Sequence, residues 1–183
     1  MLKFSRFRFL RQALIGLLSF ACVVTFAACG TSTPTTGTAA GGSLKVATEP
    51  AFPPFESQAA TGGGLEGFDI DLMNAIGEAG GFKVEFESLP FDGIIPALKA
   101  GTVDAAISAM TITAERAEAV SFSSPYFKAG LAIAVKAGDT ATTSLDALKG
   151  KRIAVQIGTT GADEAKKVPG AKITTFDSAP LAL

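Results

Sequence analysis

The sequence has no histidine, and it contains only two cysteines among its 183 residues. The absence of histidine excludes Ser-His and Cys-His nucleophile pairs and most zinc sites, whereas carboxylate-based chemistry remains possible. We expect neither a metal site nor a cofactor. Both cysteines, Cys22 and Cys29, lie near the start of the chain, and we expect processing of that region to leave no disulfide.

Basic residues are scarce once the start of the chain is set aside. Four of the 16 lysines and arginines precede residue 12, and no acidic residue lies in that stretch. Without residues 1–28, 12 basic residues face 17 acidic ones, which is a net charge of −5. Phosphate contacts need clustered cations, so we expect no nucleic-acid partner.

Residues 1–28 are predicted to be a lipoprotein signal peptide. A basic start precedes an apolar run over residues 13–28, which is short for a membrane span but suits an export signal. The run ends in Phe26-Ala27-Ala28-Cys29, which resembles a lipobox with phenylalanine where leucine is usual. We therefore predict a lipid on Cys29. The alternative is an ordinary secretory signal with an incidental cysteine.

Residues 29–42 are predicted to be a flexible tether. After Cys29 this stretch consists of Gly, Ser, Thr, Ala and one Pro, with no charge and no large apolar side chain. Such a composition cannot bury a core. If Cys29 carries a lipid, the membrane contact of the protein is this anchor alone.

The next part of the chain alternates between strand and helix patterns. We predict strands at 44–47, 83–87 and 103–108, with helices beginning at Phe68 and at Gly93. The order β-α-β-α-β implies a parallel sheet with right-handed crossovers, whose ligands bind at the carboxyl ends of the strands. The loops at that edge are 48–55, 89–91 and 108–116. Asp69 and Asp71 are expected to favour the positive end of the first helix.

The pattern continues to the last residue. We expect an apolar extended segment at 130–135, a short helix at 144–149, strands at 151–156 and 172–176, and helices after Gly161 and after Asp177 or Ser178. The small residues 158–161 leave backbone N–H groups open to an anion at the start of a helix. A plain strand-to-helix turn explains the same residues.

Residues 108–116 carry the most specific chemical signal. Thr113 is a suitable N-cap, which places Arg116 in the first turn of a short helix, where a cation is tolerated best beside an anion. The planar guanidinium binds a carboxylate through two parallel N–H bonds, which an ammonium cannot form. The alternative is a surface ion pair with Glu115 or Glu118.

Phe52 and Phe91 are each open to two interpretations. Phenylalanine is usually a core residue. Phe52 lies in a proline-rich loop, however, and Phe91 follows Pro90 just before a helix, so neither belongs to a regular apolar face. We favour pocket lining for both, because ligand pockets are largely apolar and aromatic.

Eight stretches in order resemble one family, the polar-amino-acid solute-binding proteins of ABC importers (bacterial family 3). The resemblance runs from about Leu44 to the end of the chain. It rests on residues 44–48, 53–55, 67–72, 94–98, 110–116, 122–126, 148–151 and 155–161.

The resemblance implies the roles of individual residues. Arg116 matches the arginine that pairs with the ligand carboxylate, and Thr111 matches a threonine that contacts the ligand carboxylate and amino groups. Ala109 matches a position, often glycine, whose carbonyl accepts from the ligand amine. The other matches are the aromatic walls Phe52 and Phe91, the acidic Glu49 that reaches the ligand side chain, and the second-lobe residues Gln156, Thr159, Thr160 and Gly161.

The resemblance also implies the fold and the function. The expected fold is α/β, periplasmic-binding-protein-like type II, with two lobes joined by a hinge: lobe 1 at 43–128 and a partial lobe 2 at 129–183. Because family members continue beyond the position of Leu183, we expect a truncated member that binds an amino acid weakly or not at all, whereas a chain extended by a relative's remaining segment should bind.

The implied role is that of a non-enzymatic lipoprotein outside the inner membrane, in the periplasm or at the cell surface. It would deliver an amino acid to the permease of an ABC importer. Three alternatives remain open: a dehydratase of cyclic carboxylates on the same fold, in which Glu49 would need a raised pKa to act as a general acid, a ligand-sensing domain, and a non-functional fragment.

Overall fold

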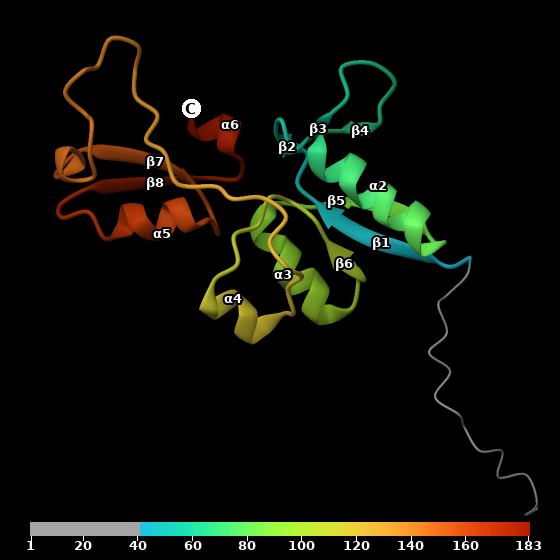
Figure 1. Ribbon diagram of the computed structural model, residues 1–183. Helices are drawn as coiled ribbons and strands as arrows, with labels where there is room; N and C mark the ends of the chain where they lie inside the picture. Colours follow the sequence, from blue (N-terminus) through green and yellow to red (C-terminus); the bar gives the residue numbers. More distant parts are fainter. Residues whose placement is uncertain (1–40) are drawn as a thin grey trace, which may run out of the picture. The chain divides into compact units, whose positions relative to one another are not determined.

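The computed structural model describes residues 41–183, which belong to a single compact unit (Figure 1). The predicted signal peptide, the lipidation site Cys29 and residues 29–40 of the predicted tether lie outside the described residues.

A three-stranded parallel sheet forms the centre of the first half of this unit. Strand β1 (Ser43–Thr48) lies between β5 (Lys83–Ser88) and β6 (Ala105–Ala106). Ser43 pairs with Lys83 and Thr48 with Ser88, while Val46 pairs with Ala105. The parallel pairing predicted from the element order is therefore confirmed. Only two residues of the predicted 103–108 strand pair in the sheet.

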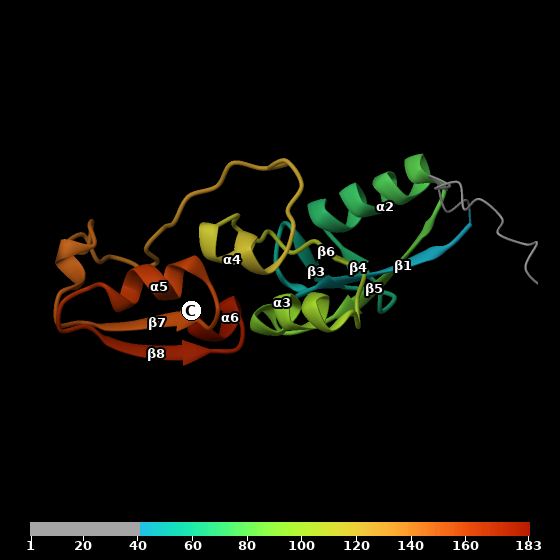
Figure 2. The same cartoon turned by 90° about the horizontal axis from the view of Figure 1, so that it is seen from below.

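Two helices cover opposite faces of this sheet, as Figure 2 shows. Helix α2 (Phe68–Gly80) contributes Met73 to a core cluster with Val46, and helix α3 (Phe91–Ala100) contributes Ile94 to a second cluster with Ala47. Successive strand side chains point to opposite faces, so the neighbours Val46 and Ala47 serve one cluster each. The last three residues of β1, Val46 to Thr48, are buried, so packing on both faces fixes where the carboxyl end of this strand lies.

The helix ends follow the sequence, with one correction. Gly81 and Gly101 cap α2 and α3 in the left-handed conformation, with φ of 72° and 69°, which glycine adopts without steric cost. Helix α3 begins two residues earlier than predicted, at Phe91, so Pro96 falls beyond the first turn. Proline has no N–H, and α3 lacks one helical hydrogen bond at that point.

The segment between β1 and α2 contains three short strands that the sequence pattern did not indicate. Strands β2 (Ala51–Phe52), β3 (Glu56–Gln58) and β4 (Leu65–Glu66) pair antiparallel in the order β2-β3-β4. They fold the loop over the start of α2, so Glu56 becomes almost fully buried, at 1% exposure.

The second half of the described chain contains a separate two-stranded parallel sheet. Strand β7 (Arg152–Gln156) pairs in register with β8 (Lys172–Phe176), with helix α5 (Thr160–Lys166) between them and helix α6 (Ala179–Ala182) after β8. A 3-10 helix, Asp146–Leu148, replaces the short helix predicted at 144–149. Strands β7 and β8 match the strands predicted at 151–156 and 172–176 closely.

The segment that joins the two halves contains no strand among the described residues. Helix α4 (Ala114–Ala119) is followed by residues 120–143, which lack regular structure. Leu131, Ile133 and Val135 are exposed there. The apolar run at 130–135 was expected to be extended, but it has no partner strand in the structure.

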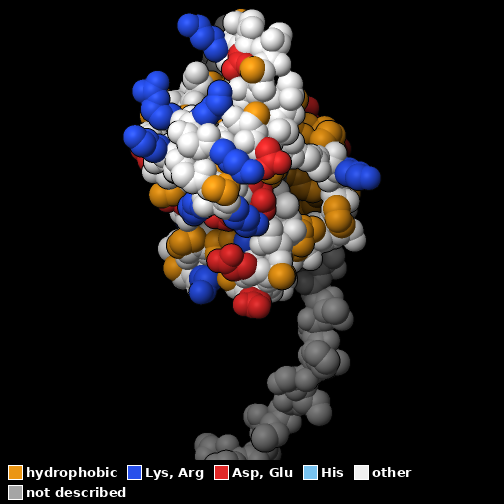
Figure 3. Space-filling model, turned by 90° about the vertical axis from the view of Figure 1, so that its left-hand side faces the viewer, with side chains coloured by type: hydrophobic (Ala, Val, Ile, Leu, Met, Phe, Trp, Pro, Cys, Tyr) orange, Lys and Arg blue, Asp and Glu red, His pale blue; other side chains and the backbone are white. Residues whose placement is uncertain are grey.

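Charged side chains are dispersed over the side that carries β7, β8 and α5 (Figure 3). Three ion pairs there join neighbours three residues apart: Lys149 to Asp146, Lys166 to Asp163 and Lys167 to Glu164. All six side chains are substantially exposed, so each pair contributes little to stability. Within residues 41–183, no helix has the length and apolar character that a membrane span requires.

Candidate functional site

The loops predicted to meet at the carboxyl edge of the sheet do meet there. The backbone N–H of Glu49, directly after β1, donates to Ser108 Oγ at 3.0 Å, and the N–H of Leu89 donates to the Thr48 carbonyl at 3.0 Å. Ser108 follows β6 by two residues. The parallel order thus brings three distant loops to one edge, which is where such sheets bind ligands.

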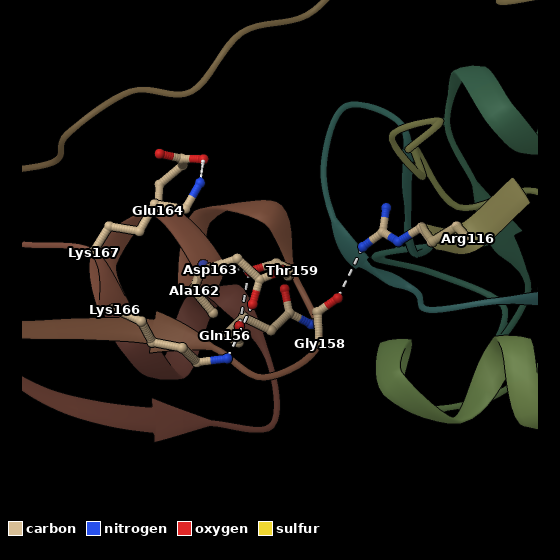
Figure 4. A network of polar contacts seen from close by, with 9 residues as sticks. All are labelled: Arg116, Gln156, Gly158, Thr159, Ala162, Asp163, Glu164, Lys166 and Lys167. Atoms are coloured by element: carbon tan, nitrogen blue, oxygen red, sulfur yellow. Dashed lines mark hydrogen bonds and ion pairs between the residues drawn. The ribbon is translucent and has the colours of Figure 1, made fainter. Parts of the chain in front are cut away.

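Arg116 reaches from α4 toward the end of β7. Thr113 is the N-cap of α4, as predicted, and its hydroxyl accepts from the Arg116 N–H at 3.2 Å. The guanidinium donates from Nη1 to the Thr111 carbonyl at 2.7 Å and from Nη2 to the Gly158 carbonyl at 2.8 Å. Figure 4 shows the second bond, which joins parts of the chain 42 residues apart.

The guanidinium retains capacity for a further acceptor. It carries five N–H donors, and within residues 41–183 two hydrogen bonds and no ion pair engage them. The predicted alternative, an ion pair with Glu115 or Glu118, is absent from the described structure. Partial burial lowers the pKa of Arg116, while the charges of Asp163 and Glu115 oppose that shift. Arginine stays protonated under these conditions, so the site offers a permanent positive charge.

The two candidate aromatic residues have different surroundings. The Phe91 ring lies under the guanidinium, with 5.4 Å from the Arg116 Cζ atom to the ring centroid, a cation–π arrangement. Phe91 also packs against the core cluster that contains Ile94, so it is at least in part a core residue. Phe52 is 41% exposed and stacks on Phe55 at 6.1 Å between centroids.

Glu49 and Gln156 form the second contact between the two halves. Gln156 Nε2 donates to both carboxylate oxygens of Glu49, at 2.8 and 2.7 Å, and it also approaches the Asp177 carbonyl at 3.3 Å. Both side chains are buried. Burial raises the pKa of Glu49, the Gln156 bond lowers it, and the Asp92 charge raises it further. Glu49 is thus a buried acid at the predicted side-chain end of the site.

Residues 157–159 form a tight turn between β7 and α5. The Thr159 hydroxyl donates to the Gln156 carbonyl at 2.8 Å and accepts from the Ala162 N–H at 3.2 Å, so it caps α5. Thr160 and Gly161 open α5 and are partly buried. Gly158 has φ of 75°, and a Cβ there would lie 2.9 Å from Asp92 Cβ. Only glycine therefore permits this close approach to α3.

Ala109 and Thr111 lie in the loop between β6 and α4. Ala109 is the one non-glycine residue with positive φ in the described chain, at 45°, a conformation that costs an alanine roughly 1–2 kcal/mol. Its N–H donates to Asp69 Oδ2 at 2.8 Å and approaches Tyr126 Oη at 3.1 Å. The Thr111 side chain is exposed, and the residue contacts Arg116 through its carbonyl.

Sequence reasoning missed a buried acidic group behind these loops. Glu56 and Asp69 are 1% and 0% exposed, and Ser108 Oγ donates to Glu56 Oε1 at 2.8 Å. Asp69 lies in the first turn of α2, as expected, and its carboxylate also binds the Ala109 N–H and the Tyr126 hydroxyl, the latter at 2.9 Å. No local pattern in the sequence signals this burial, because Glu56 stands in the polar stretch Glu56-Ser57-Gln58.

Other chemistries have less support in this part of the chain. Among residues 41–183, no cluster of three or more Cys, Asp or Glu side chains could hold a metal ion. Glu49 does have the raised pKa that a general acid requires. The hydrogen bonds from Gln156 nevertheless oppose this shift, because they favour the ionised carboxylate over the protonated form that a general acid needs.

Comparison with known proteins shows which family the chain resembles. The model of the bacterial extracellular solute-binding proteins, family 3, matches residues 44–171. A probable histidine-binding protein of Neisseria gonorrhoeae is 40% identical over 140 residues, which is 75% of this chain and 52% of that protein. The chain spans about half the length of the curated relatives it matches, which are named as binding proteins and not as enzymes.

Solved structures agree with this comparison. An ancestral arginine-binding protein bound to arginine is 50% identical with a TM-score of 0.75, over 77% of this chain and 63% of that one. An ancestral arginine-binding protein bound to glutamine is 51% identical with a TM-score of 0.74, over the same shares of the two chains. An ancestral amino acid-binding protein described as a precursor of cyclohexadienyl dehydratase is 43% identical with a TM-score of 0.74, again over 77% and 63%. The fold is therefore periplasmic-binding-protein-like type II, and the chain covers part of it.

Proposed function

Because the chain belongs to the bacterial extracellular solute-binding proteins, family 3, we propose that the whole protein captures an amino acid and delivers it to an ABC importer. The proposed ligand class is an amino acid with a polar or cationic side chain. Histidine, arginine and glutamine are the first candidates, since they are named with the relatives.

One observation carries this proposal: a basic and an acidic side chain, Arg116 and Glu49, both contact residues at the carboxyl end of β7. Arg116 binds the carbonyl of Gly158, and Glu49 binds the side chain of Gln156, two residues earlier. A guanidinium suits the α-carboxylate of the ligand, and a carboxylate suits a cationic side chain at its other end. Ala109, Thr111, Phe52 and Phe91 would line the space between, with Thr159, Thr160 and Gly161 on the opposite lobe.

We further propose that residues 43–128 and 129–183 belong to two lobes that close over the ligand. Periplasmic binding proteins are a known example of hinge closure around a ligand. The separate sheets β5-β1-β6 and β7-β8 support this division. The contacts of Arg116 with Gly158 and of Glu49 with Gln156 lie where the two proposed lobes would close on each other.

Glu49→Gln should reduce the preference for a cationic ligand. The substitution removes the charge that would face a guanidinium but keeps a hydrogen-bonding group of the same size. A charge-assisted hydrogen bond is worth about 1.5–3 kcal/mol, so we expect arginine affinity to fall about tenfold or more. Glutamine affinity should change much less. Calorimetry on the extended chain, residues 29–183 continued by the remaining segment of an arginine-binding relative, measures both.

Glu87→Gln is the matched control, because Glu87 is an exposed acid on β5. It should leave both affinities unchanged. If the extended chain binds none of the twenty amino acids, the proposed function is wrong. If Glu49→Gln lowers the affinities for arginine and glutamine equally, Glu49 does not contact the ligand side chain.

We also propose that a lipid on Cys29 anchors the protein at the periplasmic or cell-surface side of a membrane. The basic start, the short apolar run and Phe26-Ala27-Ala28-Cys29 support this. Mass spectrometry of the membrane fraction should find Cys29 as an acylated N-terminus. Cys29→Ser should move the protein out of the membrane fraction, whereas Cys22→Ser should not. A mature N-terminus at another residue, without acyl mass, would rule out the anchor.

A further inference from the structure

The least expected feature of the molecule is a pair of buried carboxyl groups behind the candidate site. Glu56 on β3 and Asp69 on α2 are almost inaccessible to solvent. Backbone and side-chain contacts bring them together: the Asp69 N–H donates to the carbonyl of Phe55, the residue before Glu56, and the two carboxyl groups bind the consecutive residues Ser108 and Ala109. Two charged carboxylates so placed in a protein interior repel each other strongly and lack the water that would stabilise them.

Each carboxyl group has one oxygen satisfied and one oxygen without a partner in the described structure. Glu56 Oε1 accepts from the Ser108 hydroxyl, and Asp69 Oδ2 accepts from the Ala109 N–H and the Tyr126 hydroxyl. Glu56 Oε2 and Asp69 Oδ1 are buried and have no hydrogen-bond partner among residues 41–183. A single hydrogen between these two oxygens would satisfy both, which buried polar atoms require.

We propose that Glu56 and Asp69 share one proton, and that this shared proton holds Asp69 in position to fix the Ala109 backbone. Asp69 is the acceptor that anchors the N–H of Ala109, whose φ of 45° is costly for alanine. Glu56 is anchored in turn by Ser108, whose hydroxyl also accepts the Glu49 N–H. The pair therefore connects two of the loops that form the candidate site. Both acids act as positioning residues.

The charges around the pair favour the protonated form. The titratable groups near Glu56 are its pair partner Asp69 on α2, Glu49 after β1 and Tyr126 after α4. No cation contributes to the shift in the pKa of Glu56. Burial is the main cause that raises the pKa of Glu56 to about 8, with the charges of Asp69 and Glu49 adding to it and the Ser108 bond opposing it. The pKa of Tyr126 is raised as well, so its hydroxyl remains a donor.

The proposal predicts a specific dependence of stability on pH. A carboxyl group whose pKa is higher in the folded state than the ordinary 4.5 stabilises the fold fully below pH 4.5 and loses that effect as pH rises toward about 8. Unfolding releases the shared proton in this range. The folding equilibrium constant should thus contain a component that falls about tenfold per pH unit between pH 5 and 8.

The test is urea unfolding of the 183-residue chain from pH 5 to 9, together with infrared spectroscopy. Glu56→Gln replaces the shared proton with an amide N–H, so its unfolding midpoint should lose the one-proton slope and exceed that of the parent chain at pH 9. The control Glu66→Gln, at an exposed acid on β4, should keep the slope. The parent chain at pH 7 should show the C=O band of a protonated carboxylic acid, and Glu56→Gln should lack it.

A double variant provides an independent check. Asp69→Asn alone can direct its NH₂ group at Glu56 and its carbonyl at Ala109, so it should fold. Glu56→Gln with Asp69→Asn places two NH₂ groups face to face, and its destabilisation should exceed the sum of the single effects. The proposal is wrong if Glu56→Gln retains the parental slope, if the carboxylic acid band is absent at pH 7, or if the double variant is simply additive.

Discussion

Arg116→Ala should lower the affinity of the extended chain for its amino acid by at least tenfold. The two charge-assisted hydrogen bonds that a guanidinium offers a carboxylate are worth about 1.5–3 kcal/mol each, and 1.4 kcal/mol corresponds to a factor of ten. Arg116→Lys should recover little of this loss, because an ammonium cannot form the two parallel bonds. Calorimetry of the three proteins with arginine, histidine and glutamine measures the effect.

The control for this substitution is Arg152→Ala, at an exposed arginine on β7. It should leave the affinity unchanged. Arg116 also bonds to Gly158, so the unfolding midpoint must be measured in parallel to separate lost affinity from lost stability. A folded Arg116→Ala variant with near-unchanged affinity would make Arg116 a structural residue and not a ligand contact.

Gly67→Ala should be the most destabilising single methyl addition at the start of α2. Gly67 has φ of 129° and ψ of 174°, a region that only glycine adopts without strain. An added Cβ would overlap the Phe55 carbonyl, with the Phe55 carbonyl carbon 2.7 Å away. Strain and overpacking together should cost roughly 2–5 kcal/mol, which is a large part of the stability of a small domain. Urea unfolding measures the change.

The same substitution should disturb the buried acid pair. The first N–H groups of α2, those of Phe68 and Asp69, donate to the carbonyls of Pro54 and Phe55 at 3.0 and 2.9 Å. A methyl group that pushes Gly67 away from Phe55 moves Asp69 with it. Gly64→Ala is the matched control, since a Cβ there would meet nothing within 4 Å, and it should change stability little. Equal unfolding midpoints for Gly67→Ala and the parent chain would contradict the close approach.

The regular elements could be predicted because their patterns are local. The alternating strand at 83–87 and the apolar face of α2 follow from the sequence alone. The predicted strand at 103–108 is regular only at Ala105–Ala106, although the N–H groups of Asp104 and Ile107 on either side still donate to carbonyls of β1. The run at 130–135 was apolar enough for a strand, but pairing depends on a partner that no local pattern reveals.

The site could be predicted in part. Thr113 and Arg116 were identified because capping and charge act within one turn of helix, and the structure confirms the cap. Glu56 could not be found, because an acid within the polar stretch Glu56-Ser57-Gln58 has the pattern of an exposed loop. Its burial results from the pairing of β3 with β2 and β4 and from the approach of α2, which are contacts between distant parts of the chain.

The measurement that tests the account most directly is a calorimetric comparison of arginine with agmatine, which is arginine without its α-carboxylate. The extended chain should bind arginine at least tenfold more tightly than agmatine. In the Arg116→Ala variant that difference should disappear, because the carboxylate would have lost its partner. Equal binding of both compounds by the parent protein, or an unchanged preference for arginine in the variant, would contradict the assignment of Arg116 as the carboxylate-binding residue.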